Sequence, residues 1–152
     1  MFFTTKHNSK YLDTEKMVLK ICDNDVKSTS CVRNMGVFFD SNMVMEKHVN
    51  ILCRSAYSHL RNIGHSRRYL TNDATKSLVN SLVMSRLDYC NGLLFGLPTT
   101  MISKLQHVQN TAAHIITRTP RFNHITPILK ELHWLPIQAR IQYRYKQFTN
   151  IC

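Results

Sequence analysis

The sequence predicts a mainly α protein, in which a short N-terminal β-hairpin or three-strand fragment precedes a bundle of about five helices. Hydrophobic side chains alternate between residues 17 and 40, as they do in strands, and recur at spacings of three and four from about residue 43 onward. The 152 residues include only 4 Gly and 4 Pro, too few for a collagen-like or Pro-rich chain. We therefore expect a β fragment over 1–42 and a helical bundle over 43–152.

Three short strands are expected in the β fragment. The first covers 17–22 and ends in the turn-forming run 23–25, after which Val26 begins a return strand. The third covers 32–39, and Gly36 within it indicates a bulge or a close approach of backbone. Because three short strands cannot enclose a sizeable core, we expect them to be the edge of a truncated structure.

Each long helix is predicted from a stripe of apolar side chains on one face. The stripes are Met45, Val49, Leu52, Ala56, Leu60 and Ile63 in the first helix; Leu78, Leu82, Ser85 and Tyr89 in the second; Ile102, Leu105, Val108, Ala112 and Ile116 in the third; and Ile137, Ile141, Tyr145 and Phe148 in the fifth. The second stripe is flanked by Val79, Val83 and Leu87. A short fourth helix is expected over 126–133.

Residues that favour helix ends divide these segments. The expected N-caps are Ser41 or Asn42, Thr71, Thr99 or Thr100, and Thr126. Gly64 suits the end of the first helix, and the segment 92–98 breaks the second. Trp134, between the fourth and fifth helices, is expected to fill the core rather than to stack on a base.

Positive charge is concentrated in two blocks of the chain. The formal net charge is +11, of which residues 43–70 carry +4 and residues 99–152 carry +6, whereas residues 71–98 are neutral. Such basic regions attract polyanions, because each cation near a phosphate releases counterions. A membrane surface would also require an exposed apolar face with aromatic anchors. Nucleic acid is therefore the expected partner, and no membrane is.

The remaining composition favours an intracellular location. No apolar run approaches the roughly 18 residues that span a bilayer. The start of the chain, residues 1–6, has too short an apolar stretch for a secretory signal. Five cysteines without a C-x-x-C pair indicate reduced thiols rather than a disulfide framework.

Ten basic residues are candidates for nucleic-acid binding. Arg54 and Arg61 lie seven residues apart and so share a helix face, with Tyr57 between them. A basic stripe with interleaved aromatic rings can follow a phosphate backbone and stack on bases or sugars. The candidates are Lys47, Arg54, Arg61, Arg67, Arg68, Lys104, Arg118, Arg121, Arg140 and Arg144. The alternative is a solvated basic face that only keeps the protein in solution.

No arrangement typical of catalysis or of a resident metal is found. The eight histidines form no H-x-x-x-H pattern, and there is no Gly-rich phosphate loop. Asp23 and Asp25 flank a turn, for which a hairpin is a simpler explanation than a metal site. Asp88 and Arg86 are predicted to form a local polar anchor. We expect no catalytic residue, no metal and no cofactor.

Several motifs occur in a fixed order along the chain. They are VRNMGVFFDSN at 32–42, SRLDYCN at 85–91, GLP at 96–98 and HITPILKELHWLP at 124–136, together with the shorter stretches 60–63 and 105–110. In this order they resemble the region downstream of the catalytic core in reverse transcriptases of non-LTR (LINE-type) retrotransposons, of the chicken-repeat and Jockey kind. The resemblance covers nearly the whole chain, from about Phe2 to the end.

The resemblance implies a role in holding template and primer. The strand at 32–40 would correspond to the last palm element, and the helices to the thumb and its extension, which grips template–primer RNA or DNA through the phosphate backbone. The family's metal-binding aspartates lie in an aromatic–x–Asp–Asp hairpin, a pattern that this sequence lacks. We therefore expect a truncated remnant, cytoplasmic or nuclear, with residual sequence-independent nucleic-acid binding and no small-molecule substrate.

Two other functions remain open at this point. A helical protein-interaction module would expose part of the apolar stripes of the first and third helices. A translated transposon relic would have no function and no stable fold. The oligomeric state is not predicted.

Overall fold

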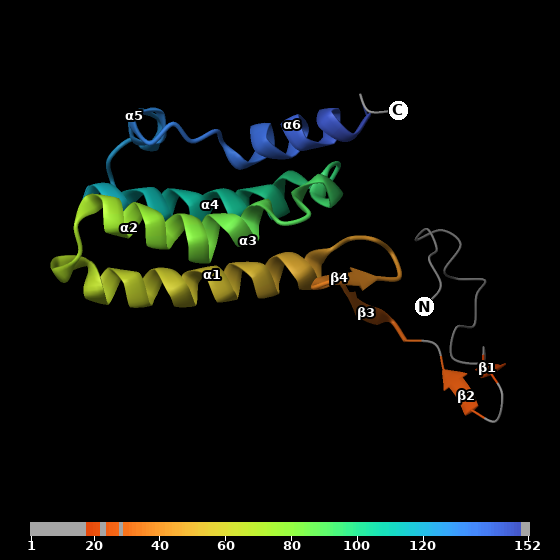
Figure 1. Ribbon diagram of the computed structural model, residues 1–152. Helices are drawn as coiled ribbons and strands as arrows, with labels where there is room; N and C mark the ends of the chain where they lie inside the picture. The colour runs from red at the N-terminus through yellow and green to blue at the C-terminus, as the bar shows by residue number, and fades with distance from the viewer. Residues whose placement is uncertain (1–17, 22–23, 28, 150–152) are drawn as a thin grey trace. The chain divides into compact units, whose positions relative to one another are not determined.

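The computed structural model describes residues 18–21, 24–27 and 29–149. The expectation about the start of the chain therefore lies outside the described residues. The chain divides into two compact units, Met1–His48 and Val49–Cys152. The mainly α fold class is confirmed, with short antiparallel strands near the N-terminus followed by helices (Figure 1).

Two antiparallel hairpins make up the β region. The strands are β1 Val18–Ile21, β2 Asn24–Lys27, β3 Cys31–Asn34 and β4 Val37–Asp40. β1 pairs with β2 and β3 with β4, each in a separate two-stranded sheet. The return strand is thus present; of the expected turn 23–25, Asn24 and Asp25 belong to β2, and Asp23 lies outside the described residues.

The expected third strand is instead the second hairpin. Arg33 pairs with Phe38, so the chain reverses between Asn34 and Val37. Met35 and Gly36 both have positive φ, 45° and 82°. Two such residues form the type I′ turn, whose twist matches that of the flanking strands. Gly36 is therefore a turn residue and not a bulge.

The carboxylate of Asp40 organises the connection from β4 to the first helix. Its two oxygens accept hydrogen bonds from the backbone amides of Val44, at 3.1 Å, and Met45, at 2.8 Å. Helix α1 begins at Glu46, the residue after these two amides. The expected cap at Ser41 or Asn42 is wrong, because both residues lie at least four positions before the start of α1.

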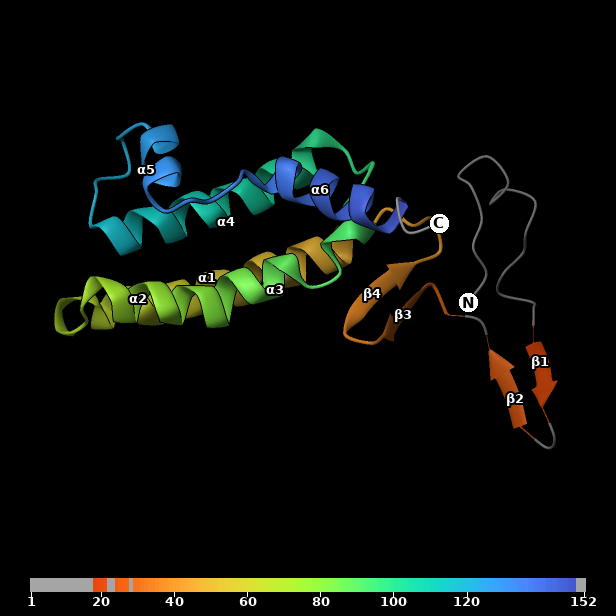
Figure 2. The same cartoon turned by 45° about the horizontal axis from the view of Figure 1, so that its top comes forward.

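The helices after this connection form a layered bundle (Figures 1 and 2). Their bounds are α1 Glu46–Ser66, η2 Arg67–Tyr69, α2 Asn72–Val79, η3 Asn80–Met84, α3 Ser85–Asp88, η4 Asn91–Leu94, α4 Thr99–Thr117, α5 Ile125–Glu131 and α6 Ile137–Thr149. The continuous rod α2–η3–α3 runs back along α1, whereas α4 packs against α2, α5 and α6.

The core of the bundle confirms two of the predicted stripes. Val49, Ala56 and Leu60 of α1 are buried, as are Leu105 and Val108 of α4. The stripe of α6 is buried at its first two positions. Trp134 is buried as expected. No helix in the described part of the chain is both long and apolar enough to cross a membrane.

The second predicted stripe is displaced by one position. Thr75, Val79, Val83 and Leu87 are buried, whereas Tyr89 is exposed. In an α-helix, residues four apart drift around the axis because a turn holds 3.6 residues. The wider π-helical turn η3 takes up that drift, so residues four apart stay on the buried face. The flanking residues of the prediction therefore form the real stripe.

Helix ends were predicted less well than helix interiors. The cap at Thr71 is confirmed, since its Oγ1 accepts a hydrogen bond from the amide of Ala74 at 3.2 Å. α4 begins at Thr99 and α5 at Ile125, so the expected caps Thr99 and Thr126 lie inside these helices, and the residues before them, Pro98 and His124, make no side-chain cap. Gly64 lies inside α1 rather than at its end.

Candidate nucleic-acid interface

One candidate, Arg67, lies inside the fold. Its guanidinium donates to the carbonyl oxygens of Ile115 at 2.9 Å, Ile116 at 2.8 Å and Leu70 at 2.8 Å, and to the side chain of Asn72. The first two carbonyls belong to the last turn of α4 and have no partner within the helix. Arg67 is 7% exposed. It fixes the end of α4 to the α1–α2 connection, which corrects the expectation that it faces a ligand.

Arg118 extends the same junction. It ends α4 in a left-handed conformation, with φ 56°, and its guanidinium donates to the carbonyl of Arg67 at 3.1 Å. Lys104, near the other end of α4, donates to the side chain of Asn50 at 3.0 Å. These contacts join the start of α4 to the start of α1 and the end of α4 to the end of α1. The two helices therefore run parallel.

Two candidates lie against aromatic rings. The ammonium of Lys47 is 5.6 Å from the centre of the Phe38 ring, a contact within the first compact unit. The guanidinium of Arg68 is 5.1 Å from the ring centre of the exposed Tyr69. Both are cation–π contacts. Arg68 and Tyr69 together present a charged and aromatic surface at the end of α1.

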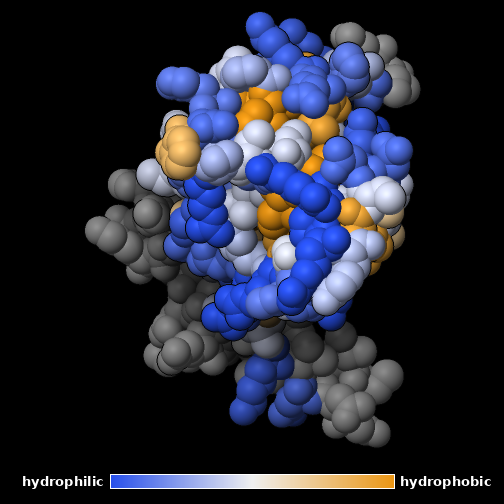
Figure 3. Space-filling model, turned by 90° about the vertical axis from the view of Figure 1, so that its left-hand side faces the viewer, coloured by the Kyte–Doolittle hydropathy of each residue, from blue (hydrophilic) through white to orange (hydrophobic). Residues whose placement is uncertain are grey.

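Arg61 and Arg121 line one cavity of about 520 Å³ beside α1 and α4. The other lining residues are Tyr57, Leu60, Gly64, His65, Thr111 and Ile115. Figure 3 looks onto this end of the bundle, where hydrophilic residues surround hydrophobic ones that show at the surface. The lining thus combines two arginines with apolar side chains, a combination that suits a ligand both anionic and partly apolar.

Arg54 lies on the same side of α1 as Arg61. Arg54, Tyr57, Arg61 and His65 follow one another at spacings of three and four residues, so they share one side of the helix. Both arginines are exposed. Sequence spacing found this part of the face. It could not place Arg121 there, because that residue comes from the loop after α4. We call Arg54, Arg61 and Arg121 the basic face.

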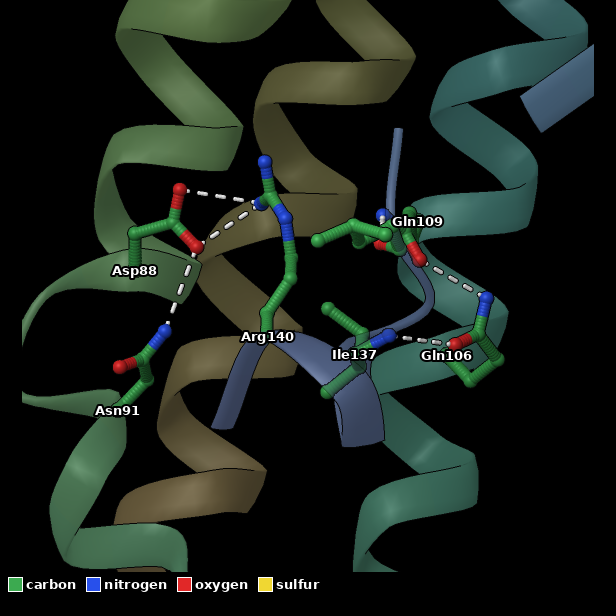
Figure 4. A network of polar contacts seen from close by, with 7 residues as sticks. Asp88, Asn91, Gln106, Gln109, Ile137 and Arg140 are labelled. Atoms are coloured by element: carbon green, nitrogen blue, oxygen red, sulfur yellow. Dashed lines mark hydrogen bonds and ion pairs between the residues drawn. The ribbon is translucent and has the colours of Figure 1, made fainter. Parts of the chain in front are cut away.

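Arg140 and Arg144 lie elsewhere: Arg144 lines a second cavity of about 390 Å³, and Arg140 contacts Asp88, another residue of its lining. Nη1 of Arg140 contacts both carboxylate oxygens of Asp88, at 2.8 and 3.0 Å (Figure 4). The charge of Arg140 is therefore compensated by Asp88 within the protein, unlike the charge of a surface arginine that is available to a ligand. Burial raises the pKa of Asp88 above its usual value, an effect that the positive charges of Arg140 and Arg144 oppose.

The expected Asp88–Arg86 anchor is wrong. Arg86 donates instead to the hydroxyl of Ser55 on α1, at 2.6 Å. Neighbours two apart on a helix point in different directions, whereas Arg140 reaches Asp88 from α6. The polar anchor thus joins distant elements rather than residues close in sequence.

Sequence reasoning missed an amide clamp beside this ion pair. Gln109 is fully buried and donates to the carbonyl of Leu135 at 2.9 Å, while Gln106 accepts from the amide of Ile137 at 2.9 Å (Figure 4). The two glutamines are joined at 2.9 Å. Both fall in the stretch 105–110 that contributes to the resemblance. The sequence did contain one signal for this clamp, because Gln109 is a polar residue four positions after Leu105, on the side of the apolar stripe of α4.

The described residues provide no metal centre. Among them, no group of three or more His, Cys, Asp or Glu side chains is placed to hold an ion. Asp25 belongs to β2, and Asp23 lies outside the described residues. Cys31, Cys53 and Cys90 are free thiols.

Comparisons with protein-family models, with curated proteins and with solved structures found no match to this chain.

Proposed function

We propose that the chain is the thumb-like part of a non-LTR (LINE-type) retrotransposon reverse transcriptase and that it binds template–primer nucleic acid without regard to sequence. The observation that carries the binding proposal is the shared cavity of Arg61 and Arg121, with Arg54 continuing the basic face along α1. Family origin rests on the ordered motifs from 32–42 to 124–136.

The chemistry of the basic face suits a phosphate backbone. Guanidinium groups donate two parallel hydrogen bonds to phosphate oxygens and keep their charge at any physiological pH. Contacts to phosphate position a duplex but carry no sequence information. A face with three arginines would therefore hold RNA, DNA or a hybrid in a fixed place without selecting its bases.

The proposal assigns no catalytic step to these residues. Two-metal polymerisation requires carboxylates that hold the ions, and the aromatic–x–Asp–Asp pattern does not occur in the sequence. The proposal also places the protein inside the cell, in the cytoplasm, the nucleus or both.

The decisive variants are Arg61→Ala and Arg121→Ala, compared with Lys130→Ala on α5, an exposed control that removes the same charge away from the basic face. We expect the two arginine variants to weaken binding to RNA–DNA hybrids of several unrelated sequences by the same factor, because each loses a phosphate contact. Fluorescence anisotropy measures this. Loss confined to one sequence, or equal loss in the lysine control, would contradict the proposal.

The protein-interaction alternative has less support. It relied on exposed apolar stripes in the first and third helices, and those stripes lie largely in the core. The relic alternative predicts no cooperative fold, so a thermal melt followed by circular dichroism distinguishes it from the proposal.

A further inference from the structure

Gly64 has no evident structural reason to be glycine. It lies inside α1, where glycine is unfavourable relative to alanine. A Cβ atom added there would meet nothing within 4 Å, so no neighbouring backbone or side chain requires its absence. Gly64 also lines the cavity of the basic face. A side chain much longer than a methyl group at this position would narrow that cavity.

We infer that this cavity holds one unpaired nucleotide of a nucleic-acid strand, with its base inside and its phosphate between Arg61 and Arg121. The inference rests on the proposed function and deepens it, because it names what the basic face does beyond following a backbone. A volume of about 520 Å³ lies within the range of small-molecule sites. It accommodates a base and sugar but not a continuous duplex.

The lining divides into two parts that match the two halves of a nucleotide. Leu60 and Ile115 provide the apolar part of the lining, and the half-exposed Tyr57 belongs to the same lining, where its ring can stack on a base. Arg61 and Arg121 provide the donors for phosphate. A simple phosphate-binding surface would not require the apolar half.

Every base has a π-face, so this site does not select sequence. It distinguishes instead between unpaired and paired nucleotides, because a paired base is held in its stack and cannot enter. The protein is thus expected to prefer a single strand, or a duplex with an unpaired end, over a blunt duplex.

The test compares a labelled oligothymidylate with an abasic strand of equal length, which keeps the phosphates and lacks the bases. We expect the full chain to bind oligothymidylate about tenfold more tightly than the abasic strand, the scale of one stacked base. Gly64→Leu narrows the cavity without changing the charge and should abolish this preference. Gly64→Ala is the matched control and should keep it.

A second pair of variants guards against misfolding. Tyr57→Ala should lose the preference and Tyr57→Phe should keep it, because stacking needs the ring and not the hydroxyl. An equal preference in Gly64→Leu and Gly64→Ala, with both folded by circular dichroism, would overturn the inference. So would equal binding of the two strands by the unchanged protein.

Two further measurements show whether the cavity binds a strand or a free nucleotide, and which of the two proposals fails. Thymidine monophosphate should compete only weakly, since it lacks the flanking phosphates. Competition as strong as that of the strand would replace the inference with a free-nucleotide site. Salt-sensitive binding of the abasic strand reports on the proposed function alone. If that binding persists without a base preference, only the nucleotide site fails.

Discussion

Arg67 shows why a basic residue in the sequence is not necessarily a ligand residue. The dipeptide Arg67-Arg68 places two cations side by side, yet only Arg68 is exposed. The guanidinium of Arg67 satisfies two carbonyls at the end of α4, where the negative end of the helix dipole favours a cation. Spacing along α1 cannot reveal this, because the acceptors lie nearly fifty residues away.

Replacing Arg67 with alanine should destabilise the protein. The change leaves buried carbonyl groups without donors, and we expect the free energy of unfolding to fall by about 3 kcal/mol. Arg67→Lys should not restore it, because an ammonium lacks the fork that reaches several acceptors. Urea unfolding measures the change, with Arg68→Ala as the exposed control. A loss as large in the control would contradict the assignment.

His48 makes stability depend on pH. Its side chain is buried, and burial lowers its pKa below the ordinary value of 6.5. The unfolded chain therefore binds a proton first as the pH falls, so acidification through about pH 6.5 favours unfolding. When the pH is lowered from about 7.5 to about 5.5, we expect the free energy of unfolding to fall less in the His48→Gln variant than in the unchanged protein. Identical losses in urea titrations would show that His48 does not contribute.

At the scale of elements, the sequence predicted where helices occur better than how each one is built. The stripes of α1 and α4 were predicted correctly because a regular helix keeps its period over many residues. The stripe of the second helix was predicted one position away from the real one. The π turn η3 changes the helical period there, and its sequence contains no glycine or proline that would indicate a change. Similarly, Gly36 indicated a local irregularity, but its left-handed neighbour Met35 was needed to make a turn.

The amide clamp determines how α6 is held. Gln109 is fully buried, and its amide reaches the carbonyl of Leu135 just before α6 begins. Gln106 completes the clamp through the amide of Ile137. Together with the Asp88–Arg140 pair, these bonds join α3, α4 and α6 (Figure 4).

Replacing Gln109 with methionine should loosen α6. Methionine has a similar length but leaves the carbonyl of Leu135 and the side chain of Gln106 without their partner, at a cost of about 2 kcal/mol. We expect the substitution to accelerate amide hydrogen exchange more in α6 than in α1. Gln138→Met, at an exposed position of α6, is the control. Uniformly faster exchange throughout the bundle would argue against a local clamp.

At the scale of the molecule, folding gathers only part of the candidate set. The basic face takes Arg54 and Arg61 from α1 and Arg121 from the loop after α4. Arg67 and Arg140 are bound by acceptors within the protein, and Lys47 belongs to the other compact unit. Helical spacing therefore found two of the three arginines, whereas Arg121 required the tertiary structure.

The salt dependence of binding to an RNA–DNA hybrid tests the central claim most directly. Each phosphate contacted by a cation contributes about −0.9 to the slope of log affinity against log salt concentration. With three arginines on the basic face, we predict a slope of about −2.7 or steeper for the unchanged protein, and one shallower by about 1 for Arg61→Ala. A slope near zero, or one that Arg61→Ala leaves unchanged, would contradict the claim that this face holds nucleic acid.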